Sequence, residues 1–212
     1  MANTTTASPS FTSYISSLFQ RKVLRTDRSR WNYQYERGSW DGLEKLDELP
    51  RFSIIAGLIQ FLKPDAPAIL EIGCGEGILA QRIGRNAYSS FIGTDVADAA
   101  IQRANERFGD DKTVFEAVDM NDYTTSQQFD VIIFNESLYY LRPMAEKLAG
   151  QYIPMLKPGG IMIISLNTGP HADGETKWNL IDTLFDTLDK TLVETTKNGW
   201  IVKTLTPKVS QS

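Results

Sequence analysis

The stretch Ala68–Ala80, AILEIGCGEGILA, most constrains what this chain can fold into. Four apolar residues and one carboxylate lead into three glycines spaced two apart, and an apolar segment follows. A short apolar run that ends at glycines is typical of a buried parallel strand. Glycines lack a β-carbon, so the backbone can turn tightly there and a ligand can approach it closely. The stretch therefore predicts a strand, a loop with a bare backbone and a helix, in that order.

Strand-like patterns return further along the chain, with helical patterns between them. The predicted strands cover 68–72, 90–95, 113–119, 129–135 and 161–165, and the predicted helices cover 76–86, 97–108 and 143–156. Strands that alternate with helices at this spacing indicate βαβ units and a parallel sheet covered on both faces. An α/β, Rossmann-like fold follows.

The C-terminal part departs from this alternation. After a predicted helix over 176–188, the strand-like runs TLVETT and WIVKTL flank the sequence KNG at 197–199. Asn-Gly between two strand-like runs is a strong hairpin signal. We therefore expect an antiparallel C-terminal hairpin that ends the sheet with an antiparallel edge strand. Together with the five earlier strands this makes a seven-stranded, mostly parallel sheet.

The N-terminal part predicts a helical cap on this sheet. Residues 11–24 carry apolar residues at helical spacing. The aromatic-rich segment 31–43 predicts a loop or irregular helix, and a second helical pattern covers 43–62, with a break expected at Pro50.

These patterns predict a single domain without internal repeats. Residues 1–10 are rich in Ser and Thr and predict a disordered tail. The domain covers 11–212, divided into a helical cap or lid over 11–64 and a core over 65–212.

Composition excludes several kinds of site and partner. The chain has 212 residues with one cysteine and one histidine, which excludes an intramolecular disulfide and the usual Cys/His zinc sites. The lone cysteine favours a reducing compartment such as the cytosol. A net charge of −4 makes nucleic acid a poor partner. Since no apolar run reaches roughly 18 residues, we expect no membrane span.

The glycine loop and the acids at the strand ends limit the kinds of ligand that can bind here. A nicotinamide dinucleotide prefers G-x-G-x-x-G, and Ile78 stands where the third glycine belongs. Carboxylates stand at three predicted strand ends, Glu71, Asp95 and Asp119. Ligands of open parallel sheets bind at these ends, and carboxylates favour a cation. S-adenosylmethionine, with a sulfonium, an ammonium and a ribose with two free hydroxyls, suits this pattern better.

Five segments together resemble the class I S-adenosylmethionine-dependent methyltransferases. They stand in the family's order and spacing over about 67–165, and the final hairpin agrees with the family's seven-stranded sheet. The segments are LEIGCGEG from Leu70, GTDVADAAIQRA from Gly93, VDMND from Val118, FDVIIFNESLYYL from Phe129 and LKPGG from Leu156.

The resemblance implies a set of cofactor-binding residues. By this resemblance, the methionine part of the cofactor is lined by Glu71, Gly73 and Gly75, with Cys74 between the glycines as a small buried residue, and it is faced by Asn135. The two ribose hydroxyls are bound by Asp95. The adenine lies against Val96, its amino group meets Asp119, and its ring accepts from the backbone amide of Met120. Two alternatives stay open. Asp122 could take the place of Asp119, and acids at strand ends also serve as helix caps.

The candidate catalytic residues follow the fourth and fifth predicted strands. Glu136 could attract a cationic amine or accept a proton. Tyr139 and Tyr140 could form an aromatic wall or hydrogen-bond the acceptor, or one of them could be core packing. His171 has a pKa range that suits a general base. The N/D-P-P-Y signature of methyltransferases acting on planar nitrogens of nucleic acids and proteins is missing, and ESLYYL more distantly resembles N-methyltransferases of amino sugars.

Aromatic residues gather in the segment that precedes the core. Trp31, Tyr33, Tyr35 and Trp40 could cover the open strand ends as a lid that sheds water and stacks on the sulfonium. They could equally anchor the helical cap to the sheet.

We therefore expect a methyltransferase that moves a methyl group from S-adenosylmethionine to a hydroxyl or amine of a small metabolite. One alternative is a non-catalytic partner subunit that binds the cofactor. Another is a methyltransferase acting on protein or RNA, which only the basic cluster Arg21–Arg30 supports. A nicotinamide-dependent oxidoreductase is disfavoured, because Tyr140 is followed four residues on by Met144 rather than Lys.

The role of His171 can be tested by substitution. If its imidazole is the general base, His171→Ala lowers turnover by about 100-fold or more, since positioned proton transfer contributes roughly 10²–10⁴-fold. Initial rates of S-adenosylhomocysteine release measure this. Unchanged turnover removes His171 from the mechanism.

Overall fold

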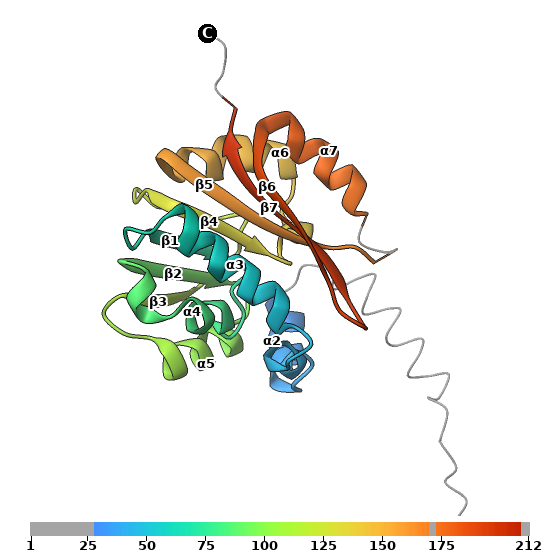
Figure 1. Ribbon diagram of the computed structural model, residues 1–212. Helices are drawn as coiled ribbons and strands as arrows, with labels where there is room; N and C mark the ends of the chain where they lie inside the picture. The colour runs from blue at the N-terminus through green and yellow to red at the C-terminus, as the bar shows by residue number, and fades with distance from the viewer. Residues whose placement is uncertain (1–27, 170–172, 209–212) are drawn as a thin grey trace, which may run out of the picture.

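A sheet of seven strands forms the centre of the computed structural model, which describes residues 28–169 and 173–208 (Figure 1). The strand order is β3-β2-β1-β4-β5-β7-β6. The strands are β1 (Ala68–Ile72), β2 (Ser90–Asp95), β3 (Thr113–Ala117), β4 (Phe129–Asn135), β5 (Leu156–Asn167), β6 (Phe185–Glu194) and β7 (Gly199–Pro207). The Rossmann-like, mostly parallel sheet that the sequence predicts is thereby confirmed.

Helices cover both faces of this sheet. The α-helices are α2 (Arg28–Glu36), α3 (Leu49–Leu62), α4 (Ile78–Ile83), α5 (Asp98–Phe108), α6 (Met144–Lys147) and α7 (Gly174–Leu184). Shorter elements are the 3₁₀ turns η1 (Asp41–Glu44), η2 (Arg85–Ala87), η3 (Leu138–Tyr140) and η5 (Ile153–Met155), and the π-helical turn η4 (Leu148–Tyr152). Residues of α3, α4 and α5 form the core on one face, and residues of η4, η5 and α7 form it on the other.

The central strands are apolar on both sides because both faces are covered. In β4, Val131 and Ile133 join the core under α3 and α4, while Ile132 and Phe134 join the opposite core. All four side chains are fully buried. Continuous apolar runs of this kind are what a strand buried on two faces requires.

The chain changes direction across the sheet between β1 and β4. From β1 the chain adds β2 and then β3 on one side, and β4 then pairs with β1 on the other side. Both neighbours run parallel to β1, so the carboxyl ends of β1, β2 and β4 lie at one edge. Open α/β sheets bind ligands at such a reversal point.

The C-terminal hairpin is confirmed, with two corrections. The predicted helix over 176–188 ends at Leu184, because residues from Phe185 onward pair with β7 up to Pro207. The strand that opposes the others is β7, which pairs antiparallel with both β5 and β6. It lies one place in from the edge, so the edge strand β6 runs parallel to the rest.

The N-terminal section needs a further correction. Pro50 does not break a helix but lies in the first turn of α3, where its missing N–H leaves no hydrogen bond unmade. The segment 31–43 contains the end of α2 and most of η1. The predicted tail over 1–10 and the predicted helix over 11–24 lie outside the described residues.

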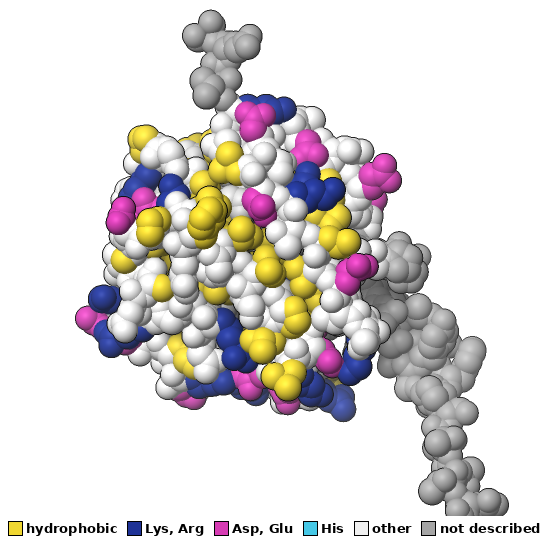
Figure 2. Space-filling model, in the orientation of Figure 1, with side chains coloured by type: hydrophobic (Ala, Val, Ile, Leu, Met, Phe, Trp, Pro, Cys, Tyr) yellow, Lys and Arg dark blue, Asp and Glu magenta, His cyan; other side chains and the backbone are white. Residues whose placement is uncertain are grey.

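The outer side of α3 keeps apolar side chains at the surface. Phe61 is 81% exposed, and Ile54 and Leu58 are half-buried. Figure 2 shows hydrophobic side chains running along this part of the molecule. Within residues 28–169 and 173–208, no helix combines the length and the apolar character that crossing a membrane requires.

Candidate functional site

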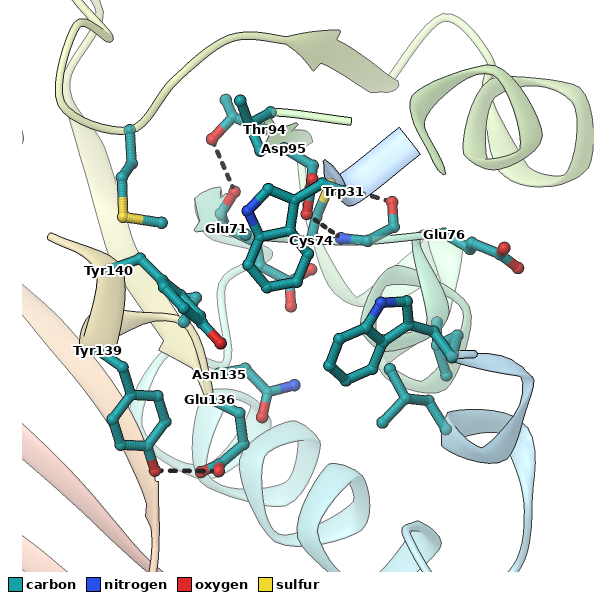
Figure 3. Close-up of a pocket in the computed structure, with 18 of the residues that line it drawn as sticks. Trp31, Glu71, Cys74, Glu76, Thr94, Asp95, Asn135, Glu136, Tyr139 and Tyr140 are labelled. Carbon is teal, nitrogen blue, oxygen red and sulfur yellow. Dashed lines mark hydrogen bonds between the residues drawn. The ribbon is translucent and has the colours of Figure 1, made fainter. Parts of the chain in front are cut away.

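A cavity of about 370 Å³ opens at the carboxyl ends of β1, β2 and β4 (Figure 3). Among its lining residues are all but one of the predicted site residues: Glu71, Gly73, Cys74, Gly75, Asp95, Val96, Asp119, Met120, Asn135, Glu136, Tyr139 and Tyr140. The exception, His171, lies outside the described residues. The sheet therefore gathers side chains from the ends of four strands into one space.

The loop after β1 keeps its backbone close to β2. The amides of Gly73 and Cys74 both donate to Thr94 O, at 2.7 and 2.9 Å. Gly75 adopts a φ of 54°, and a β-carbon there would lie 2.8 Å from the Tyr35 hydroxyl. Glycine suits that position best, because the left-handed backbone disfavours a side chain and a β-carbon would force the Tyr35 hydroxyl to move.

Glu71 is a carboxyl buried at the end of β1. Its Oε2 atom is inaccessible to solvent and has no hydrogen-bond partner among the residues that the structure describes. Burial raises the pKa of Glu71 to about 8, against the opposing attraction of the Arg51 guanidinium and a hydrogen bond with Asn135. A buried carboxyl needs a proton or a cation, and this one faces a cavity that can admit a cation.

Asp95 fixes the loop that it faces. Its Oδ2 accepts from the Gly75 amide at 3.0 Å, and its Oδ1 accepts from the Ala97 amide at 2.9 Å. Burial raises its pKa, while these backbone hydrogen bonds oppose the rise. Each carboxylate oxygen can accept more than one hydrogen bond, so this anchoring leaves Asp95 able to bind a ligand hydroxyl.

Of the two acids weighed after β3, Asp119 is the one at the cavity. Its Oδ1 accepts from the backbone and side-chain amides of Asn121, both at 2.8 Å. Asp122 is exposed and does not line the cavity. Met120 is held beside it, because its carbonyl accepts from the Gln151 amide and the Tyr152 hydroxyl.

A hydrogen-bond network surrounds Glu136 on the opposite side of the cavity (Figure 3). Its carboxylate accepts from the Ser165 hydroxyl at 2.9 Å and from the Tyr139 hydroxyl at 3.1 Å. The Asn167 amide in turn donates to Tyr139 at 2.6 Å. Burial raises the pKa of Glu136, and the attraction of Arg51 opposes that rise. Tyr139 keeps its proton, since burial raises its pKa as well.

Arg51 also lies in the wall of this cavity. It is not among the predicted site residues. Its side chain is 2% exposed and donates to Asn135 Oδ1 and to Glu48 Oε2, the latter at 2.9 Å. A signal for it exists in the sequence. Arg51 is the one charged residue of the mostly apolar helix LPRFSIIAGLIQFL, and a buried charge is nearly always paired.

Aromatic side chains from α2 and the following turn close the remaining side. The Trp31 ring stacks on Trp40 at 5.8 Å and meets the edge of Tyr140 at 5.0 Å. Tyr35 also lines the cavity, whereas Tyr33 is 48% exposed and does not. Three of the four predicted lid residues therefore cover the opening.

The segment that carries these rings is tied to α5. Arg28 and Asn32 both donate to Asp98, at 3.0 and 3.1 Å, and Arg103 donates to the Tyr35 carbonyl at 3.2 Å. The rings line the cavity while the helix that carries Trp31 and Tyr35 is anchored to α5 by polar contacts.

Two further observations concern a possible metal cluster and the Cys74 thiol. Within the described ranges, no three His, Cys, Asp or Glu side chains are grouped to hold a metal ion. Burial raises the pKa of the Cys74 thiol well above its usual value. A protonated thiol is a poor nucleophile.

Comparison with known proteins agrees with this geometry. Residues 70–162 match the sequence pattern of a family described as a methyltransferase domain. The N-methyltransferase NodS of Bradyrhizobium japonicum, solved in complex with S-adenosyl-L-homocysteine, is 21% identical with a TM-score of 0.68 over 80% of this chain and 92% of NodS.

A second solved structure aligns over nearly the whole chain. The 1,6-didemethyltoxoflavin-N1-methyltransferase of Burkholderia thailandensis, with bound 1,6-didemethyltoxoflavin and S-adenosylhomocysteine, is 17% identical with a TM-score of 0.70 over 98% of this chain and 94% of that one. At this identity the likeness shows a shared fold.

The alignments with the curated relatives cover only part of each relative. The mitochondrial arginine-hydroxylase NDUFAF5 of Rattus norvegicus is 27% identical over 77% of this chain and 45% of its own length. The chain spans less than half the length of the first curated relatives that it matches.

The buried carboxyl of Glu71 predicts a pH-dependent stability. Its folded pKa is raised, so the folded state keeps a proton that the unfolded state loses as pH rises from about 4.5 to about 8. Stability is therefore full below pH 4.5 and falls up to pH 8. We expect Glu71→Gln to remove this loss and to raise the free energy of unfolding at pH 8 by up to roughly 5 kcal/mol.

Urea denaturation of the ligand-free protein at pH 5, 6.5 and 8 measures this difference. Glu116→Gln, which removes an exposed carboxylate on β3, is the control and is expected to follow the wild type. A Glu71→Gln variant that is no more stable than the wild type at pH 8 contradicts a protonated Glu71.

Proposed function

We propose that this chain transfers the methyl group of S-adenosylmethionine to an amine or hydroxyl of a small metabolite, as the match of residues 70–162 to a methyltransferase domain supports. The observation that carries this proposal is the cavity at the ends of β1, β2 and β4. It places the partnerless oxygen of Glu71 and the hydrogen-bonded carboxylate of Glu136 in one enclosed space.

The residues on the Glu71 side fit the cofactor. When bound, S-adenosylmethionine supplies a methyl group on a positively charged sulfur, together with an ammonium and two ribose hydroxyls. Glu71 offers a buried acceptor to the ammonium, and Asp95 offers its remaining lone pairs to the hydroxyls. Charge-assisted hydrogen bonds of this type are roughly twice as strong as neutral ones.

Residues after β2 and β3 would hold the adenine. Val96 and Met120 give apolar contact in the cavity wall, and Asp119 can accept from the exocyclic amino group. The Met120 carbonyl accepts from Gln151 and Tyr152, which holds in place the residue whose amide would donate to the ring. The backbone of Gly73 and Gly75 would face the methionine part.

On the acceptor side the chain aligns the nucleophile and removes its proton. Glu136 is held by Ser165 and Tyr139 and can accept a proton from the amine or hydroxyl as the new bond to carbon forms. That proton then passes from Glu136 to solvent. Alignment of the reacting groups supplies roughly 7–11 kcal/mol of the barrier reduction. Trp31, Trp40 and Tyr140 exclude water while this happens.

Two observations favour nitrogen over oxygen as the acceptor atom. The two solved structures described above, NodS and the toxoflavin-pathway enzyme, are named as N-methyltransferases. A carboxylate that retains its charge attracts an ammonium, and Glu136 stands where the acceptor would enter. The small enclosed volume supports a metabolite rather than a macromolecule.

Asp95→Ala tests the cofactor site. The substitution removes the ribose acceptor and releases the Gly75 amide, so affinity for S-adenosylmethionine falls by at least about 100-fold, since each hydrogen bond to a charged group is worth roughly 1.5–3 kcal/mol. Isothermal calorimetry measures the affinity. Asp122→Ala, which removes a neighbouring acid outside the cavity, is expected to bind as the wild type does.

The reaction itself is tested by screening metabolites for release of S-adenosylhomocysteine, with amines and alcohols compared in parallel. Wild-type affinity in Asp95→Ala contradicts the placement of the cofactor. Binding without product release from any acceptor contradicts the transfer and indicates a cofactor-binding subunit.

A further inference from the structure

We propose that Arg51 is a positioning residue for the methyl transfer: its guanidinium holds Asn135 in place and supplies the fixed positive charge of the acceptor side. The inference rests on the proposed function, since it assigns how the proton acceptor Glu136 is kept ready.

Arg51 is the one cation among the described residues that line the cavity. The same wall contains six carboxyl groups, those of Glu48, Glu71, Glu76, Asp95, Asp119 and Glu136. Glu76 has partners of its own in Arg103 and Arg107. The charge of Arg51 therefore decides how many of the inner acids can be ionised together.

The guanidinium is held by two aromatic rings and two hydrogen bonds, while its Nε is buried without a hydrogen-bond partner among the described residues. It lies over the Phe52 ring at 4.5 Å and over the Trp200 ring at 5.3 Å. One of its terminal nitrogens donates to Asn135, and the other donates to Glu48. A planar group with two donors can hold two acceptors at once, which a lysine ammonium on a flexible stem does less well.

These hydrogen bonds join three segments that are far apart in the sequence. Glu48, at the start of α3, accepts from the Asn198 side chain at 3.1 Å, and Asn198 lies in the turn between β6 and β7. Arg51 continues the chain of contacts to Asn135 at the end of β4. The line Asn198–Glu48–Arg51–Asn135 thus crosses the acceptor side of the cavity.

The residue after Asn135 is Glu136, whose backbone is strained. Its φ is 62°, and a residue with a side chain costs about 1–3 kcal/mol in such a conformation unless its surroundings hold it there. The Glu136 amide donates to Ser165 O at 3.2 Å, and its carboxylate accepts from Ser165 and Tyr139. Arg51 holds the side chain of Asn135, the residue before Glu136, and so adds to the contacts that support the strained backbone of Glu136.

The charges that face Glu136 come from several elements. Arg51 on α3 lowers its pKa, against a larger rise caused by burial. Tyr139, after β4, donates to it, and Lys177 on α7 lies 5.4 Å from the centre of the Tyr139 ring. Arg51 acts in the same direction on Glu71. Removing its charge would push both carboxyls toward the protonated form.

The test compares Arg51→Met and Arg51→Lys with a matched control. Lys203 on β7 is also a buried cation, with Asp182 on α7 at 2.7 Å and the Trp178 ring at 4.6 Å, but it lies outside the cavity. Lys203→Met therefore removes a buried charge of the same sheet without touching the acceptor side. Thermal melts establish that each variant folds.

The first readout is the titration of Glu136 by NMR on protein labelled with ¹³C-glutamate, with the signal assigned by Glu136→Gln. We expect its pKa to rise by about one unit or more in Arg51→Met, because a nearby opposite charge shifts a carboxyl by roughly 1–3 units. In Arg51→Lys and Lys203→Met it should stay at the wild-type value. A wild-type titration in Arg51→Met overturns the proposal.

The second readout is the side-chain amide signal of Asn135. It should move in both Arg51 variants, since neither keeps the two-donor fork, and stay in place in Lys203→Met. This readout decides the matter even if Arg51→Met does not fold: an unmoved Asn135 signal in Arg51→Lys overturns the positioning role.

The pH dependence of turnover distinguishes a failure of this inference from a failure of the proposed function. With an acceptor that the wild type methylates, Arg51→Met should lose about tenfold in turnover at pH 7 and recover as pH rises, because Glu136 must ionise to take the proton. Turnover that falls equally at all pH values overturns the inference alone. Failure of the wild type to bind S-adenosylhomocysteine overturns the proposed function and leaves the two NMR readouts standing.

Discussion

Acidic side chains are buried away from water at the ends of the parallel strands. The rest of the cavity depends on how the charge of these buried acids is balanced. Glu71 ends its strand inside the protein because β1 is covered on both faces. Its free oxygen must find a proton or a cation. In the protein alone the proton is retained, and a positively charged ligand can take its place. The same burial that stabilises the sheet therefore creates the preference for a cationic donor.

On the acceptor side, the buried carboxyl group is balanced by a cation of the chain itself. Arg51 enters from α3 and meets Glu48 and Asn135, so that two sides of one cavity differ in how their charge is balanced. On the cofactor side Arg51 also attracts Glu71, but Glu71 Oε2 lacks a hydrogen-bond partner among the described residues, so a cationic ligand can complete the charge balance. On the acceptor side the charge of Arg51 is permanent, which suits a carboxylate that has to accept a proton in each turnover.

Much of this arrangement can be predicted from local sequence. The apolar runs and the glycines place Glu71, Asp95 and Asp119 at strand ends, and parallel pairing brings those ends together. What depends on tertiary contact cannot be read in this way. The helix expected to reach 188 ends at Leu184 because β7 offers a partner for the following residues. Arg51 is visible only as an isolated charge in an apolar helix, and its partners lie 3 and 84 residues away.

The exchange of a proton for a cation at Glu71 is the central claim, and calorimetry measures it directly. S-adenosylmethionine binding is titrated at pH 7 in buffers of different ionisation enthalpy, which gives the number of protons released. With a pKa of about 8, Glu71 is about nine-tenths protonated before binding, so close to one proton should leave in the wild type and almost none in Glu71→Gln. Binding that releases no proton, or the same number in both proteins, would contradict the account.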